Sequence, residues 1–99
     1  MERGGCVYIM TNKYRTALYI GMTSDLPGRI WEHKNNHYPA SFTTRYKLYY
    51  CVYYESFFSI QEAILREKEL KGWLRKKKDM LITSSNPNWL DLWDEIKEW

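Results

Sequence analysis

Two strand-like segments near the N-terminus, residues 6–11 and 17–22, constrain the fold of this chain most strongly. Each carries a tyrosine, Tyr8 and Tyr19, and ten residues separate the two. A polar, turn-rich stretch joins the segments, which is typical of an antiparallel hairpin. Matching the aliphatic side chains of the two segments on one face sets a register. That register predicts that Tyr8 lies directly opposite Tyr19 on the other face.

Length and composition narrow the class of protein. The chain has 99 residues, so we expect one domain over residues 1–99 with a core of about residues 5–93. The net charge of +3 permits attraction to a polyanion but does not by itself predict nucleic-acid binding. Cys6 and Cys51 lack metal-ligand spacing and predict a reduced, cytoplasmic protein. No apolar run reaches the roughly 20 residues of a membrane span, and no signal peptide is visible.

Caps, breakers and periodicity predict the remaining elements. In chain order these are a helix over residues 25–34, a polar loop over 35–44, a strand over 46–55, helices over 59–72 and 73–83, a break at 84–87 and a helix over 89–99. Asp25 is the predicted N-cap of the first helix, and Ser59 with Glu62 forms a capping box. The strand is apolar on both faces if its side chains alternate. We therefore expect helices or a partner to cover it on both sides.

Glu67 is the sharpest chemical signal, because it lies in the middle of an apolar helical stripe. A desolvated lone charge is costly, so this carboxylate must be paired, protonated or bound to a metal. One interpretation is a metal ligand. The alternative is a structural salt bridge to Lys71, Arg29 or Lys68, and such pairs are common.

Arg29 and His33 lie one helical turn apart on a common stripe. The planar guanidinium of Arg29 suits the oxygens of a phosphate, and His33 can accept a proton near neutral pH. Each residue also has an ordinary interpretation, as a solvated arginine and a hydrogen-bonded histidine. Tyr8 and Tyr19 can likewise be half-buried sheet residues, since a phenol with a pKa of about 10 is a poor base at pH 7 without help.

A basic cluster over residues 68–78, interleaved with Trp73, suits phosphate contacts and stacking on bases. A solvated helix face has the same composition, so this cluster leaves both interpretations open.

Several short motifs are more informative together than singly. They are Cys6-Val7-Tyr8, then Tyr19-Ile20-Gly21 with Thr23, Asp25-Leu26 with Arg29 and His33, Phe42-Thr43 with Arg45-Tyr46, Tyr53-Tyr54-Glu55, Ala63-Ile64 with Arg66-Glu67-Lys68, Lys71 and Trp73, and Asn86-Pro87 with Trp89 and Asp91-Leu92. In this order and spacing the chain resembles the GIY-YIG nuclease superfamily, in particular its small stand-alone members, over about residues 7–93.

The resemblance implies a role for each matching residue. Glu67 would bind one divalent metal, Mg²⁺ or Mn²⁺, and Arg29 would grip the scissile phosphate. Tyr8, Tyr19 and His33 would orient and deprotonate the attacking water. Four further residues are expected to contact the substrate or shape its site: Asn86, Arg45, Lys68 and Lys71.

Two positions depart from the family pattern. Cys6 stands where the first motif has a glycine, and we expect a small side chain to be tolerated there. Gly28 stands where an arginine often precedes Arg29. Together with Pro27 it is expected to loosen the start of the helix and to weaken contacts with DNA.

We therefore predict an α/β (α+β) domain with a three-stranded antiparallel sheet in the order 2-1-3, flanked by helices. The predicted function is metal-dependent endonuclease cleavage of DNA phosphodiester bonds, in DNA repair or processing. The substrate is expected to be selected by its structure or with the help of a partner protein. The alternative is a non-catalytic nucleic-acid-binding module or an assembly subunit on the same fold, and a homodimer built on residues 49–54 is compatible with either.

Overall fold

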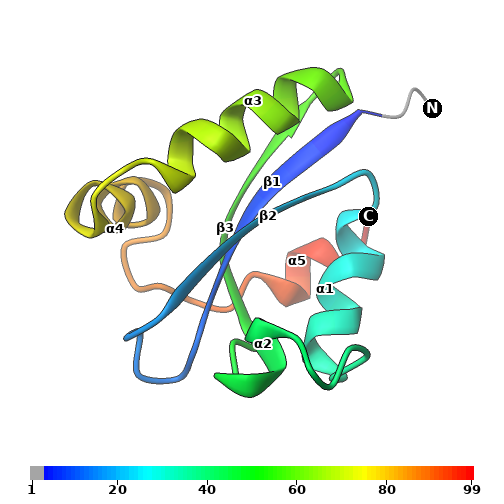
Figure 1. Ribbon diagram of the computed structural model, residues 1–99, viewed down its shortest axis with the longest axis vertical. Helices are drawn as coiled ribbons and strands as arrows, with labels where there is room; N and C mark the ends of the chain where they lie inside the picture. Colours follow the sequence, from blue (N-terminus) through cyan, green and yellow to red (C-terminus); the bar gives the residue numbers. More distant parts are fainter. Residues whose placement is uncertain (1–3) are drawn as a thin grey trace.

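The computed structural model of this chain describes residues 4–99, which form one antiparallel sheet with helices on both faces (Figure 1). The elements are β1 (Gly5–Thr11), β2 (Leu18–Thr23), α1 (Leu26–Lys34), α2 (Phe42–Arg45), β3 (Tyr50–Phe57), α3 (Ile60–Lys71), α4 (Arg75–Ser85) and α5 (Trp93–Ile96). The strand order is β2-β1-β3. This confirms the predicted fold class and sheet order.

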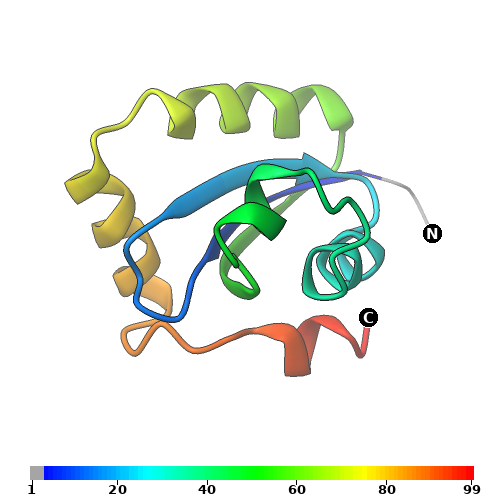
Figure 2. The same ribbon diagram turned by 60° about the horizontal axis from the view of Figure 1, so that its bottom comes forward.

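The sheet separates two hydrophobic clusters, and each cluster belongs to one layer of helices (Figure 2). On one face, Tyr8 and Met10 of β1 pack with Leu26 and Ile30 of α1 and with α5. On the other face, side chains of β1 pack with α3 and α4. Every residue of β1 is buried, so this central strand supports the side chains and helices packed on both faces of the sheet.

The register of the hairpin differs from the prediction by two residues. Tyr8 lies opposite Gly21, and Tyr19 lies opposite Met10. A shift of two residues keeps every side chain on its predicted face, because the side-chain period of a strand is two. The predicted direct pairing of Tyr8 with Tyr19 is therefore wrong, although both tyrosines still project from the same face.

The third strand also departs from simple alternation. Ile9 pairs with Tyr53 and Met10 pairs with Cys51, so Val52 is an extra residue in a β-bulge. The bulge places Val52 and Tyr53 on the same face of the sheet, whereas strict alternation predicts opposite faces for them. Helices cover both faces of this strand, so the apolar character of its two sides needs no partner chain.

The strand begins at Tyr50 rather than at residue 46, because a short helix precedes it. The hydroxyl of Ser41 caps this helix, α2, by accepting the backbone N–H of Thr44. Lys47 then adopts a positive φ of 59°, which reverses the chain before the strand. The predicted polar loop over residues 35–44 therefore ends in one turn of helix.

The other helix starts follow the sequence signals. Asp25 accepts the backbone N–H of Gly28 at 3.2 Å, and Ser59 with Glu62 forms the predicted capping box. Gly28 lies within α1, and its backbone N–H is bonded to the Asp25 cap. Its expected loosening of the helix start stays a prediction. A Cβ at this position would press against the Asp25 carboxylate, whose Cγ would lie 3.0 Å away.

The C-terminal helix is much shorter than predicted. Trp89 has a positive φ of 51°, and Leu92 donates its backbone N–H to the carbonyl of Cys51 at 2.8 Å. The Asp91 carboxylate accepts the backbone N–H groups of Trp93 and of Cys51 in β3, both at 3.2 Å. Because these contacts tie residues 89–92 to β3, only Trp93–Ile96 is helical. Among residues 4–99, no helix is long and apolar enough to cross a membrane.

Candidate active site

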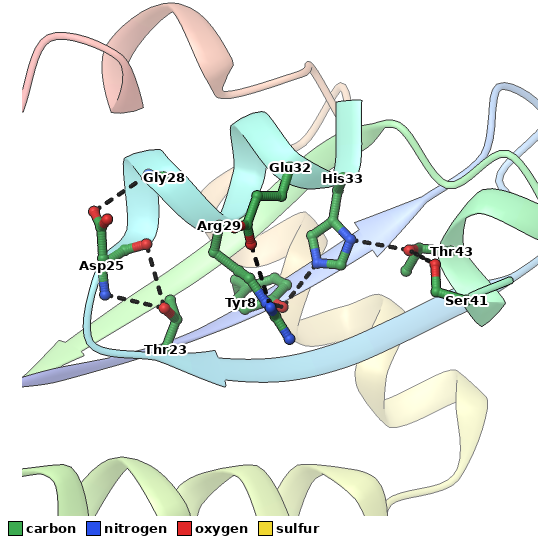
Figure 3. A network of polar contacts seen from close by, with 9 residues as sticks. All are labelled: Tyr8, Thr23, Asp25, Gly28, Arg29, Glu32, His33, Ser41 and Thr43. Atoms are coloured by element: carbon green, nitrogen blue, oxygen red, sulfur yellow. Dashed lines mark hydrogen bonds and ion pairs between the residues drawn. The ribbon is translucent and has the colours of Figure 1, made fainter. Parts of the chain in front are cut away.

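A buried hydrogen bond between Tyr8 and His33 lies at the centre of the site (Figure 3). Tyr8 projects from the central strand and is 0% exposed, and His33 reaches down to it from α1. The phenol oxygen lies 2.9 Å from Nε2 of the imidazole. On the other side of the ring, Nδ1 lies 2.9 Å from the hydroxyl of Thr43 in α2. The histidine is thus held between two oxygen atoms from different elements.

Arg29 completes the network, one turn before His33 on α1. Its Nε donates to the Tyr8 oxygen at 3.4 Å, and its Nη1 pairs with Glu32 at 3.3 Å. The guanidinium also lies over the ring of Tyr38 at 5.8 Å. About a third of the Arg29 side chain remains exposed, so the guanidinium connects the buried phenol with the surface (Figure 3).

Burial sets the protonation states of this network. It raises the pKa of the Tyr8 phenol well above its ordinary value of 10.0, although the hydrogen bond from Arg29 opposes that shift. Burial and the nearby charge of Arg29 lower the pKa of His33 to about 4. At neutral pH the network therefore holds a protonated phenol beside a neutral imidazole. Because burial disfavours both the phenolate and the imidazolium, it opposes proton transfer from Tyr8 to His33 while the site is closed to water.

Tyr19 lies at the open edge of the same network. Its ring centroid is 6.3 Å from that of Tyr8 and 5.7 Å from that of His33. Unlike Tyr8, Tyr19 is half-buried, and its other side stacks on the exposed ring of Phe42. Phe42 in turn contacts Tyr46, with centroids 4.7 Å apart. A row of aromatic rings thus leads from the buried network to the surface.

Comparison with known proteins identifies the family of this chain. The model of the GIY-YIG catalytic domain matches residues 4–80. The chain belongs to the GIY-YIG family. A UPF0213 protein of Bacillus pumilus (strain SAFR-032) is 38% identical over 66 residues, which are 67% of this chain and 66% of that relative. The chain thus spans slightly less than two thirds of the length of this relative. No solved structure matches the chain significantly.

The structure places Glu67 apart from the network of this GIY-YIG domain. Glu67 lies on α3, and α3 covers the opposite face of the sheet from α1 (Figure 2). Its side chain is 21% exposed and pairs with the ammonium of Lys71 at 3.3 Å. Glu67 is therefore not a lone buried anion, and the salt bridge to Lys71 left open by the sequence is present.

The residues around Glu67 can be tested against the divalent metal that GIY-YIG nucleases use. Mg²⁺ keeps several waters and is commonly held by one or two carboxylates together with substrate phosphates. Glu67 offers one accessible carboxylate, and its partner Lys71 is exposed enough to move aside. No group of three or more His, Cys, Asp or Glu residues among residues 4–99 could hold a metal alone. The donor set therefore fits a metal whose shell is completed by water and phosphate, and does not fit a cage made by the protein alone.

Asn86, expected to contact the substrate or to shape its site, is buried with its amide bonded inside the fold. It is 6% exposed, and its amide nitrogen donates to the carbonyls of Val52 and Leu90 at 3.0 and 2.9 Å. Its amide oxygen accepts the backbone N–H of Leu90 at 3.0 Å. These bonds use both N–H groups, so Asn86 braces the loop after α4 against β3 and has no donor left for a phosphate.

The predicted basic side chains differ in their availability. Arg45, Lys68 and Lys71 are exposed, as substrate contacts require. Arg75, within the predicted basic cluster, instead donates to the backbone carbonyls of Arg15 and Thr16 at 2.7 and 3.0 Å. It therefore fixes the β1–β2 turn to α4.

Thr43 and Tyr38, which contact His33 and Arg29, were not predicted as site residues. The motif over residues 42–46 marked this segment as shared with the family but gave no role to the threonine hydroxyl. Only the fold brings α2 against α1, so sequence spacing could not indicate these contacts.

Proposed function

We propose that this GIY-YIG domain is a divalent-metal-dependent endonuclease that hydrolyses phosphodiester bonds in DNA. The observation that carries the proposal is the buried contact of Tyr8 with a neutral His33 on one side and Arg29 on the other. A domain that only binds nucleic acid gains affinity from exposed cations and has no need for a sealed proton-transfer pair. The family membership supports the same function.

Each residue has a chemical task in this proposal. Arg29 binds the scissile phosphate through guanidinium N–H groups that Tyr8 does not use, and it stabilises charge as the phosphorus is attacked. Once substrate binding has opened the site to water and reduced the desolvation of both groups, His33 takes the proton of the Tyr8 hydroxyl, and Arg29 stabilises the resulting phenolate. The phenolate then deprotonates the attacking water. Tyr19, which is closer to solvent, orients that water.

Substrate binding must first open the site. A phenol that is 0% exposed cannot contact bulk water, and the Arg29–Glu32 pair lies at the surface of the network. A substrate phosphate competes with Glu32 for Arg29. In this proposal, phosphate binding therefore breaks the Arg29–Glu32 pair and opens the site to water. Glu67, on the helix that covers the other face of the sheet, would hold the metal ion. The ion would supply Lewis-acid stabilisation of the leaving oxygen to a substrate that reaches past the edge strand β2 to both Arg29 and Glu67.

The surface around the network favours a substrate with unpaired bases. Three exposed aromatic side chains surround it: Tyr38, Phe42 and Tyr46. Aromatic rings stack on bases of any sequence, provided that the bases are not already stacked in a duplex. We therefore include flaps, branches and single strands in the proposed substrate class, with Arg45, Lys68 and Lys71 as backbone contacts and with a partner protein as a further source of selectivity.

The setting of the activity is part of the proposal. Cys6 and Cys51 are both free and buried, which supports a reducing compartment such as the cytoplasm. DNA repair or processing is the proposed process.

A cleavage assay over single-stranded, flapped, branched and duplex DNAs, with Mg²⁺ or Mn²⁺ and with a chelator control, tests the proposal. Cleavage of at least one substrate that stops on chelation supports it. Binding without cleavage of any substrate contradicts it and favours the nucleic-acid-binding alternative.

A further inference from the structure

A chain of hydroxyl groups connects His33 to a backbone carbonyl in the segment before α2. Thr43 Oγ1 lies 2.9 Å from His33 Nδ1 and 3.1 Å from Ser41 Oγ. Ser41 Oγ lies 3.3 Å from Thr44 Oγ1, which lies 3.1 Å from the carbonyl oxygen of Tyr38. Thr43 is only 2% exposed, so water does not compete at the contact with the histidine.

The carbonyl end fixes the direction of every bond in this chain. A carbonyl can only accept, and each hydroxyl has one proton to donate. Thr44 therefore donates to the Tyr38 carbonyl, Ser41 donates to Thr44, and Thr43 donates to Ser41. The Thr43 oxygen must then accept from His33, which places the proton of the neutral imidazole on Nδ1.

The other end of the network requires the same direction. Arginine has no acceptor, so Arg29 Nε donates to the Tyr8 oxygen. The proton of the buried Tyr8 hydroxyl then needs an acceptor, and the atom within hydrogen-bond distance is Nε2 of His33, at 2.9 Å. No buried side-chain nitrogen or oxygen among residues 4–99 lacks a partner, so the two ends agree.

We propose that the hydroxyl chain of Thr43, Ser41 and Thr44, anchored on the Tyr38 carbonyl, sets the Nδ1–H tautomer of His33 and so makes Nε2 the proton acceptor for Tyr8. Thr43 is then a positioning residue, which acts through His33. The use of this tautomer in catalysis rests on the proposed function, but the tautomer itself does not.

The proton balance is simple. The O–H bond of Tyr8 breaks and an N–H bond forms at Nε2, which gives a phenolate held by Arg29 and an imidazolium. The imidazolium still donates its Nδ1–H to Thr43, so no bond of the hydroxyl chain has to reverse. In the opposite tautomer Nε2 would already carry a proton and could not accept one from Tyr8.

Nitrogen NMR of ¹⁵N-histidine-labelled protein at pH 7 tests the proposal directly, because protonated and unprotonated ring nitrogens resonate far apart. The chain has two histidines, and a His37→Gln variant assigns the signals of His33. We expect wild type to show a protonated Nδ1 and an unprotonated Nε2. The opposite assignment would overturn the proposal.

Two variants separate the hydroxyl chain from Tyr8 as the cause. In Tyr8→Phe only the hydroxyl chain can set the tautomer, so Nδ1 should remain protonated. A mixture of tautomers in that variant would overturn the proposal. Thr43→Val, which replaces the hydroxyl by a methyl of similar size, is therefore made in the Tyr8→Phe background, where it should raise the share of the Nε2–H tautomer severalfold. Thr43→Ser in the same background should keep Nδ1 protonated. An unchanged Nδ1–H tautomer in the Tyr8→Phe, Thr43→Val protein would also overturn the proposal.

Cleavage kinetics give a second readout. Thr43→Val should lower kcat at least tenfold with KM nearly unchanged, and Thr43→Ser should recover most of kcat. A Thr43→Val enzyme with wild-type kcat would overturn the role of the tautomer in catalysis. If the protein cuts no DNA but His33 has the expected tautomer, the proposed function fails and the inference about the hydroxyl chain stands.

Discussion

Gly21 lies opposite Tyr8 in the β1–β2 ladder, and the Tyr8 phenol occupies the space that a side chain at Gly21 would need. A Cβ on Gly21 would lie against the Tyr8 hydroxyl, 2.5 Å from Cζ of the same ring and 2.9 Å from Cε2 of Tyr19. Distances this short require one of the rings to move. The glycine of the second motif therefore makes room for the tyrosine of the first.

Gly21→Ala should consequently displace Tyr8 from His33. We expect a loss of about 1–3 kcal/mol in the free energy of unfolding, as for other overpacked cores, together with the loss of any cleavage. Chemical denaturation measures the first effect. Gly72→Ala is the matched control, because its added Cβ would meet nothing nearer than 3.5 Å, and its stability should be unchanged or higher. Equal stability of the two variants would show that Gly21 does not make room for Tyr8.

Tyr8→Phe removes one hydroxyl and leaves the packing of the sheet intact. The buried Nε2 of His33 loses its hydrogen-bond donor, so the free energy of unfolding should decrease by about 1–3 kcal/mol. Most of the cleavage rate should be lost. Tyr54→Phe is the control, since Tyr54 lies on the same face and its hydroxyl donates to the exposed Glu95 at 2.6 Å. If Tyr8→Phe cuts normally while His33→Ala does not cut, the histidine itself is the base and the role of Tyr8 is wrong.

The free energy of unfolding should decrease as the pH is lowered, because of His33. Its pKa is lowered from the ordinary 6.5 to about 4 in the folded chain, by burial and by the charge of Arg29, against the opposing charge of Glu32. Between these values the unfolded chain binds a proton that the folded chain does not, so stability is complete above about pH 6.5 and is lost toward pH 4. The difference between pH 7 and pH 5 should be about 1–2 kcal/mol.

Denaturation of wild type, His33→Gln and His37→Gln at both pH values isolates this contribution. His33→Gln should lose part of the pH dependence, whereas His37→Gln should keep it because His37 is exposed. Identical pH dependence in all three proteins would contradict the lowered pKa of His33.

Much of this fold is visible in the sequence because its signals are local. The caps at Asp25 and Ser59 and the apolar hairpin need only their neighbours, and the structure confirms them. The hairpin register and the bulge at Val52 could not be predicted, because both depend on pairing between strands and not on the local sequence. The shortening of the last helix could not be predicted either, because Leu92 donates its backbone N–H to the carbonyl of Cys51 in β3, which is far away in the sequence.

The candidate site was predictable to a similar extent. The spacing of Arg29 and His33 indicated a shared face, and the fold brings both to Tyr8. The sequence could not show that the Asn86 amide donates to the carbonyls of Val52 and Leu90. Its role in positioning the phosphate or shaping the site stays a prediction. The roles of Tyr8, Tyr19 and Glu67 in catalysis stay predictions.

Glu67→Gln separates a metal ligand from a structural ion pair. The Glu67–Lys71 pair lies at the surface and contributes about 0–1 kcal/mol, so the variant should melt close to wild type without metal. Mn²⁺ should raise the melting temperature of wild type but not of Glu67→Gln, and cleavage should be lost. Glu69→Gln, which removes an exposed partner of Arg66 on the same helix, should keep both the metal response and cleavage. The same Mn²⁺ response in all three proteins would remove Glu67 from the metal site.

The central claim is that the Tyr8–His33–Arg29 network cuts DNA, and Arg29→Ala tests it most directly. The guanidinium is partly exposed and its ion pair with Glu32 contributes little to stability, whereas a transferring phosphate would depend on it. The measurement is the single-turnover cleavage rate of wild type and Arg29→Ala on the best DNA substrate, beside their melting temperatures. We predict a rate loss of at least about 100-fold with a nearly unchanged melting temperature. A rate within about twofold of wild type in the folded variant would contradict the account.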